Sequence, residues 1–184
     1  MLHFRLQLAN INSPPVWRRL TVPDHFSFHR FHLVIQAAFG WENSHLYQFS
    51  ENGYQSDWSI STPSEDEWRE VKNSRKIRLS EVFHTKGQSF TYIYDFGDDW
   101  LHTIIVEDIT DSDAATADCI AGKGACPPED CGGAWGYEAL KETMADPKHP
   151  EYKELRQWLG LKKGEEWNSA IFHISAAKKA VGRL

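Results

Sequence analysis

The sequence predicts an α+β fold: a mixed β-sheet with one helix packed across it, followed by a cysteine- and glycine-rich loop and C-terminal helices. Residues 3–8 and 16–22 alternate apolar and polar side chains, which is typical of half-buried strands. Residues 27–40 change to the 3.6-residue period of an amphipathic helix. Residues 89–96 and 101–109 are again rich in β-branched and aromatic residues. The order strand, strand, helix, strand is β-grasp-like.

The helix over 27–40 has a start signal and a stop signal. Ser27 can cap the first free amides, and Gly40 can take the left-handed conformation at the end. Phe31, Ile35 and Phe39 fall on one face of this helix. We therefore expect these three side chains to be nearly fully buried against the sheet.

Shorter elements fill the region between this helix and the strand at 89–96. Residues 45–50 and 54–61 flank Asn52-Gly53, a strong hairpin signal. Residues 76–79 predict a short strand, and residues 80–83 predict a single helical turn. The strands at 89–96 and 101–109 flank the turn sequence "GDDW" and predict a second antiparallel hairpin.

After Asp113 the chain is small and polar, and helical patterns return only at 136–144, 150–160 and beyond Ser175. The helix over 150–160 is expected to bury three apolar side chains, those of Leu155, Trp158 and Leu159. We expect one domain over 1–184, with the sheet and helix in 1–112 and a Cys/Gly loop with a helical lobe in 113–184.

Composition and charge exclude several classes of protein. The net charge is −6 and the pI is near 5.8, which argues against nucleic-acid binding. The N-terminus lacks a signal-peptide pattern, and no window holds 18 apolar residues, so the sequence predicts a cytoplasmic location without a membrane span. In that compartment the three cysteines are expected to be free thiols. The oligomeric state is left open.

The chain from Gly87 to Gly122 has no Lys or Arg but eight carboxylates. They are Asp95, Asp98, Asp99, Glu107, Asp108, Asp111, Asp113 and Asp118. In the turn 95–102 the aspartates can cap the backbone, or they can hold a divalent cation together with His102. Carboxylates this close together raise one another's pKa unless a positive charge compensates them, and Arg18 and Arg19 are candidates for that charge.

The cysteine loop offers a second candidate metal site. Cys119, Cys126 and Cys131 have six and four residues between successive thiols, unlike the C-x₂₋₄-C pairs of structural zinc sites. In one interpretation the three thiolates and a histidine such as His102 hold a zinc ion. In the other the cysteines are buried thiols in a tight glycine loop, and this interpretation is favoured. Histidines 45 and 149 are alternative donors. The neighbouring acidic pair 129–130 disfavours Cys126 as a nucleophile.

Four long segments occur in the order "PPVWRRLTVP", "FHRFHLVIQAAFGWENSHLYQF", "YDFGDDWLHTIIVE" and "CIAGKGACPPEDCGGAWGYEAL". Together they resemble the plasmid pRiA4b ORF-three-like family, whose members also carry a resolvase name as insertion-element passengers. The resemblance implies a small cytoplasmic α+β domain of mobile-element context. Near its end the chain departs from the family pattern at 167–169 and 172–173. Serine recombinase chemistry is rejected, because no Arg-rich catalytic helix or basic tail is present.

Two functions remain from these observations. The first is a non-catalytic protein-interaction or adaptor module that presents an aromatic and acidic surface to a protein partner. The alternative is a metal-dependent hydrolytic enzyme, using zinc or manganese, built from the acidic turn 95–102 and the Cys loop 119–131. The loop and the turn are expected to lie against each other. The residues expected to line the resulting cleft are Asp95, Asp98, Asp99, His102, Glu107, Cys126 and Asp130.

Overall fold

The computed structural model describes residues 1–64 and 70–184, in which eight strands form one sheet. The strands are β1 (Leu2–Asn12), β2 (Pro15–Val22), β3 (Tyr47–Ser50), β4 (Trp58–Ser61), β5 (Glu70–Asn73), β6 (Ser89–Tyr94), β7 (Trp100–Ile109) and β8 (Asp118–Lys123). Their order is β5-β4-β3-β6-β7-β1-β2-β8, and all neighbours are antiparallel except β4 and β5. The α+β class is confirmed, whereas the β-grasp-like order is not, since β1 lies between β2 and β7 and is antiparallel to both.

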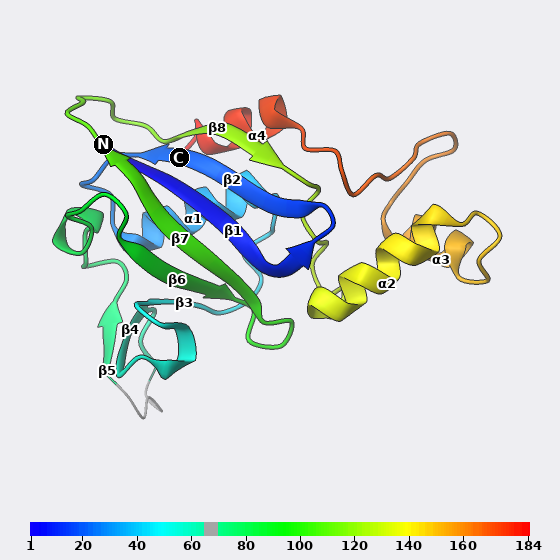
Figure 1. Ribbon diagram of the computed structural model, residues 1–184, viewed down its shortest axis with the longest axis horizontal. Helices are drawn as coiled ribbons and strands as arrows, with labels where there is room; N and C mark the ends of the chain where they lie inside the picture. Colours follow the sequence, from blue (N-terminus) through cyan, green and yellow to red (C-terminus); the bar gives the residue numbers. More distant parts are fainter. Residues whose placement is uncertain (65–69) are drawn as a thin grey trace.

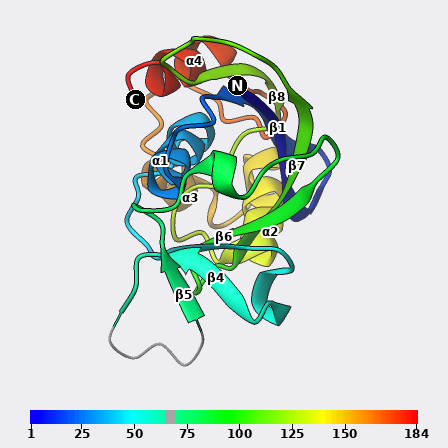
Figure 2. The ribbon, with the colours of Figure 1, turned by 90° about the vertical axis from the view of Figure 1, so that its left-hand side faces the viewer.

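The sheet has one covered face and one open face. Helix α1 (Phe28–Phe39) lies across the first, and no helix of the described chain lies over the other face of β1, β6 and β7 (Figures 1 and 2). In β1 the even-numbered side chains from Leu2 to Leu8 are buried and the odd ones are half-buried. The period of two read from the sequence therefore separates a core face from an open face.

Helix α1 begins and ends as the sequence predicts. The Ser27 hydroxyl accepts a hydrogen bond from the Arg30 amide, and Gly40 takes a φ of 92°. Phe31 and Ile35 are 0% exposed and Phe39 is 4% exposed, so their predicted burial is confirmed.

Aromatic rings fill the space between α1 and the sheet. The Phe31 ring stacks on Phe4 with centroids 4.7 Å apart and on Phe49 at 5.7 Å, and Phe28 meets Phe49 edge-on at 5.1 Å. Such pairs add to the free energy gained by burying each ring. Most of the chain's aromatic residues thus belong to the core of the sheet half.

The strand and turn predictions before residue 89 hold in part. β3 and β4 pair as a hairpin through Phe49 and Ile60, and its connection contains the 3₁₀ turn Gly53–Gln55. The strand expected at 76–79 is wrong, since only an isolated bridge between Ser27 and Arg78 forms there. Its place is taken by β5, which pairs parallel with β4. The helical turn predicted at 80–83 is the 3₁₀ turn Leu79–Glu81. Residues 70–78 belong to a basic segment of the sequence that begins at residue 68, and its first two residues, 68 and 69, lie outside the described residues.

The C-terminal region contains an unpredicted strand and three helices. β8 pairs with β2 at the sheet edge, where the sequence indicated only loop. The helices are α2 (Gly133–Ala145), α3 (Tyr152–Trp158) and α4 (Ile174–Val181). α4 packs against β8 and α1, while α2 and α3 extend to one side of the sheet (Figure 1). No helix of the described residues is long and apolar enough to cross a membrane.

Helix α3 does not bury the residues expected of it. None of its residues is fully buried, Leu155 and the adjacent Leu159 are half-buried, and Trp158 is 47% exposed. The apolar stripe of this helix faces a groove instead of a closed core.

Candidate functional site

The acidic turn between β6 and β7 is stabilised by its own aspartates. Asp95 and Asp99 take left-handed φ angles of 56° and 55°, which aspartate tolerates better than most residues. Oδ1 of Asp95 accepts a hydrogen bond from the Gly97 amide at 2.9 Å. Asp99 accepts one from the Tyr54 hydroxyl at 2.7 Å. The turn-capping interpretation of these carboxylates therefore agrees with the geometry.

The cysteine loop lies directly against this turn. The Gly132 amide donates a hydrogen bond to Oδ2 of Asp98 at 3.2 Å. A Cβ atom on Gly133 would lie 2.7 Å from the Asp98 carbonyl oxygen, a clash with backbone, and Gly133 has a φ of 67°. The glycine pair lets the loop approach the turn closely.

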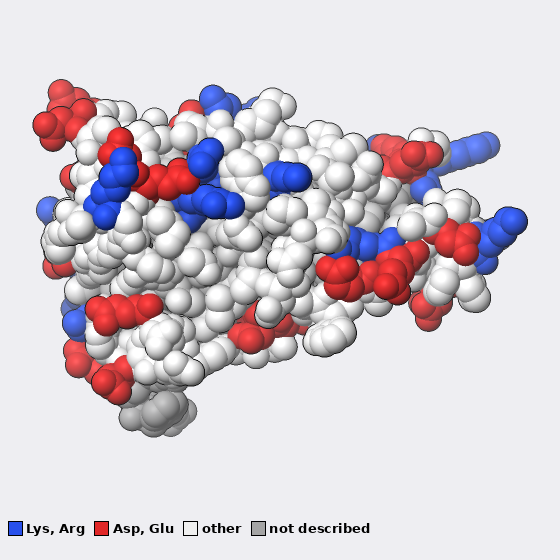
Figure 3. Space-filling model, viewed as in Figure 1, with Lys and Arg blue, Asp and Glu red and all other residues white. Residues whose placement is uncertain are grey.

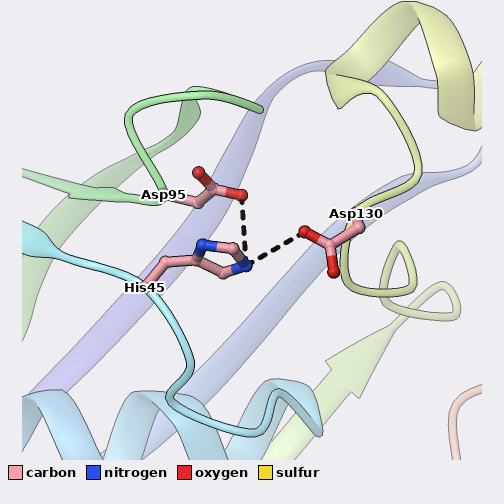
Figure 4. A group of neighbouring side chains, drawn as sticks. All are labelled: His45, Asp95 and Asp130. Carbon is pink, nitrogen blue, oxygen red and sulfur yellow. Dashed lines mark ion pairs between the residues drawn. The ribbon is translucent and has the colours of Figure 1, made fainter.

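A histidine and several carboxylates meet where the loop and the turn touch (Figure 4). Nε2 of His45 lies 3.1 Å from Oδ1 of Asp130, 3.6 Å from Oδ2 of Asp95 and 3.7 Å from Oε2 of Glu129. This nitrogen is buried and has no hydrogen-bond partner among the described residues. Potential ligand atoms of His45, Asp95 and Asp130 all lie within 4.8 Å of one another. The four residues 45, 95, 129 and 130 are called the His45 cluster below.

Glu129 is held in the His45 cluster by its second oxygen. Oε1 of Glu129 accepts hydrogen bonds from the Glu42 amide at 2.7 Å and from the Tyr94 hydroxyl at 3.0 Å. The Ser44 amide donates to the same tyrosine oxygen. Burial of the hydroxyl, reinforced by the Glu129 charge, raises the pKa of Tyr94, which therefore stays protonated and donates. Oε2 of Glu129 accepts a second, longer hydrogen bond from the Tyr94 hydroxyl at 3.3 Å and also faces His45 at 3.7 Å.

Two residues assigned to the predicted cleft lie elsewhere. His102 is fully buried under the edges of Phe39 and Trp41, and its Nδ1 lies 2.8 Å from the Trp100 carbonyl, to which it can donate. Burial lowers the pKa of His102 to about 3. Glu107 sits on the open face of the sheet and pairs with Arg19 at 2.8 Å. Side chains alternate across a strand, so the β7 residues of the sequence motif point to different environments.

The arginines proposed to neutralise the acidic turn have other partners. Arg18 is 1% exposed, and its guanidinium donates to backbone carbonyls of Trp17, Ala38, Lys123 and Gly124 at 2.8–3.0 Å. Arg19 projects from the opposite side of β2 to Glu107. The three aspartates of the turn are compensated by backbone amides, Tyr54 and the His45 cluster instead.

All three thiols are free. Burial is the largest cause of the raised pKa of each thiol. It raises the pKa of Cys119 to about 11 and that of Cys131 to about 12. It raises the pKa of Cys126 further still. In the described part of the chain the cysteines do not form with His102 a group of ligand atoms close enough for one ion, whereas the His45 cluster does.

The pairing of His45 with residues 129 and 130 was not predicted from the sequence. The sequence offers His45 only as a donor to the thiolates. It places Asp130 in the expected cleft and, with Glu129, beside Cys126, but it gives His45 no place near either carboxylate. The available signal was the turn chemistry shared by "FGDDW" and the glycine loop, which placed Asp95 and Asp130 near each other. His45 belongs to a third segment, the connection from α1 to β3, and nothing local in the sequence indicates where it points.

A groove opens between α2 and α3, beside the His45 cluster. It has a volume of about 410 Å³. Its walls include Ala139, Leu140, Leu155 and Trp158, and Asp130 of the His45 cluster also lines it. The α2–α3 groove therefore adjoins the His45 cluster and shares Asp130 with it.

Comparison with known proteins shows that the chain belongs to the family described as plasmid pRiA4b ORF-3-like protein, whose family model matches residues 1–176. It is 39% identical over 175 residues to the uncharacterized protein y4hQ of Sinorhizobium fredii strain NBRC 101917 / NGR234, covering 94% of this chain and 86% of that protein. Its structure is similar to the crystal structure of a protein of unknown function, MM3350 from Methanosarcina mazei Go1. The TM-score is 0.78, the identity is 32%, and 95% of each chain is covered.

Proposed function

We propose that this protein is a non-catalytic interaction module whose α2–α3 groove binds a basic, amphipathic segment of a protein partner. The observation that carries the proposal is the exposure of Trp158 in the wall of the groove; Trp135, which is outside the residues that line it, is a second exposed tryptophan on these helices. Trp135 on α2 is 89% exposed and Trp158 on α3 is 47% exposed. Tryptophan is enriched at protein interfaces because it buries a large apolar area and keeps a polar handle.

The groove supports an apolar anchor. Leu140 on one wall is 4% exposed and belongs to the core, while Leu155 and Trp158 on the other wall are only partly covered. An apolar side chain entering between the two helices would cover these surfaces and remove them from water. Each fully buried Leu- or Phe-sized anchor contributes about 1.5–3 kcal/mol.

Charge selects the flanks of the partner segment. Asp130, Glu151 and Glu154 line the groove. The single lysine of α2, Lys141, already pairs with Glu138 at 2.7 Å. Figure 3 shows acidic side chains gathered over α2, at the end of the molecule away from β4 and β5. Opposite charge speeds association and suppresses wrong partners, so Lys or Arg beside the anchor fits this site.

The hydrolytic alternative has less support. It needs the acidic turn and the Cys loop to present a general base or a nucleophile together. His102 lies in the core, and the high thiol pKa values keep the cysteines protonated near neutral pH. The turn and loop do meet, but the side chains at their junction hold each other and the backbone.

A defined peptide pair tests the interaction. The probe is a fluorescent amphipathic helical peptide with a Leu face and Lys/Arg flanks, and its control is the same peptide with Glu at every basic position. Fluorescence anisotropy should show binding of the basic peptide alone. Trp158→Ala and Glu154→Lys should each weaken it at least tenfold. Ile120→Ala removes an exposed apolar side chain on β8 instead and should leave binding unchanged.

Three results would refute this proposal. Neither peptide binds, both bind equally, or binding is insensitive to Trp158→Ala although circular dichroism shows a folded variant. Analytical ultracentrifugation of the protein alone tests whether a second copy of the chain occupies the groove. A dimer that Trp158→Ala dissociates would replace the basic partner by self-association.

A further inference from the structure

We propose that the His45 cluster binds one Zn²⁺ ion through Nε2 of His45 and carboxylate oxygens of Asp95 and Asp130. The proposed site shares Asp130 with the α2–α3 groove but does not depend on peptide binding there, because the geometry of His45 and Asp95 carries it. It assigns a cation to the junction of three segments: the α1–β3 connection, the β6–β7 turn and the Cys loop.

The spacing in the cluster is that of ligands around one ion. The distances from His45 Nε2 to the carboxylate oxygens of Asp130 and Asp95 are 3.1 and 3.6 Å. Charge-assisted hydrogen bonds are shorter, about 2.7–2.9 Å. Ligands at 2.0–2.2 Å from a zinc ion at the centre of a tetrahedron lie about 3.3–3.6 Å from one another. The group therefore has room for a cation between its atoms.

Burial provides a second, independent argument. The Asp95 side chain is only 9% exposed, and Oδ2 accepts no hydrogen bond from the described residues. His45 Nε2 is enclosed and also lacks a hydrogen-bond partner in residues 1–64 and 70–184. A buried carboxylate beside a buried, unbonded nitrogen is costly unless a charge compensates it. A divalent cation satisfies both atoms at once.

The donor set selects zinc among divalent ions. Imidazole nitrogen with carboxylate oxygens suits zinc, whereas an all-oxygen shell suits magnesium or calcium. Oε2 of Glu129, 3.7 Å from Nε2, or a water takes the fourth position.

The ion would join the loop to the sheet and touch the partner groove. Asp130 is 73% exposed and lines the α2–α3 groove as well as the cluster. Zinc would fix this carboxylate on the cluster side. The metal therefore stabilises the start of α2, which follows the loop two residues after Cys131.

The test uses the full-length protein, freed of metal with a chelator and returned to chelator-free buffer. Titration with zinc followed by calorimetry should give one ion per chain. His45→Gln and Asp95→Asn should each reduce the affinity at least tenfold, since even outer-shell changes cost ten- to hundredfold. Asparagine tolerates the left-handed φ of position 95, so the turn is preserved. His25→Gln and Asp99→Asn, at an exposed histidine and a neighbouring aspartate, are the matched controls and should bind as the unchanged protein does.

Cobalt as a spectroscopic substitute identifies the ligands. A tetrahedral nitrogen–oxygen site gives visible absorption without a sulfur-to-cobalt charge-transfer band. Such a band, lost in Cys131→Ser, would move the ion to the thiols and overturn the proposal. The absence of zinc binding, full binding by folded His45→Gln, or stoichiometric manganese in preference to zinc would also overturn it.

Discussion

The two halves of the chain use aromatic residues in opposite ways. In residues 1–112 most phenylalanines pack into the core between α1 and the sheet, with Phe28, Phe31 and Phe49 0% exposed, whereas Phe96 in the acidic turn is 46% exposed. In residues 113–184, Trp135 and Trp158 stand in solvent on helices that border an open groove. The first half buries most of its aromatic rings in a core, whereas the second half leaves two large apolar side chains exposed to solvent. The comparison teaches that a high tryptophan content by itself does not tell core from surface.

The two halves meet where β2 pairs with β8 and α1 packs against α4, a region called the seam below. Arg18 of β2 lies in the seam. Its guanidinium lies 4.9 Å from the ring of Phe39 in α1 and 3.8 Å from that of Phe172. It also donates to the carbonyls of Lys123 and Gly124. A Cβ on Gly122 would lie 2.4 Å from the Phe172 ring, so the segment around Phe172 packs closely against the seam.

The largest effect that separates the halves is expected from Phe31→Ala. It removes a ring that stacks on Phe4 and Phe49 and leaves a cavity, so the free energy of unfolding should fall by about 3–5 kcal/mol. Leu155→Ala in half-buried α3 should cost below about 1 kcal/mol. Urea-induced unfolding measures both. Equal losses would show that α3 belongs to the same core.

Acid should destabilise the first half by protonating its buried histidines. Burial lowers the pKa of His102 to about 3 and that of His32 to about 4, below the value of about 6.5 in an unfolded chain. The unfolded state therefore binds more protons between these values. Stability is complete above pH 6.5 and falls on acidification by about 1.4 kcal/mol per pH unit for each histidine.

Urea unfolding at pH 7 and pH 5 checks this sign and size. Stability should be about 3–4 kcal/mol lower at pH 5 if both histidines contribute. His32→Gln should flatten the pH dependence by about half. If the free energy of unfolding did not change between pH 7 and pH 5, the core would not contain buried neutral histidines.

A pair of neighbouring arginines tests the seam itself. Arg18→Leu leaves several carbonyls of β2, α1 and the start of the Cys loop without their donor, which should cost about 2–3 kcal/mol. Arg19→Leu breaks a half-exposed ion pair with Glu107 on the open face and should cost at most about 1 kcal/mol. Thermal or urea unfolding compares them. A larger loss for Arg19 would place the important contacts on the open face.

The sequence by itself determined the elements whose signals are local. The alternation in β1 and β2, the period of α1 and its caps at Ser27 and Gly40 all formed where the pattern indicated. The turn between β6 and β7 also followed from its own aspartates and glycine. In each case the hydrogen bonds or the apolar face involve residues a few positions apart, so a short window of sequence contains the physical cause.

Tertiary structure alone decided the pairings between distant segments. β8 became a strand because β2 offered it an edge, and α3 stayed exposed because no further layer covers it in the described chain. His45 reached Asp130 because the Cys loop docked on the acidic turn, whereas His102, on a strand of the same motif, turned into the core. Each outcome depends on which surface a segment meets after folding. Local propensity does not encode that choice, since the free energy involved comes from contacts between residues far apart in the chain.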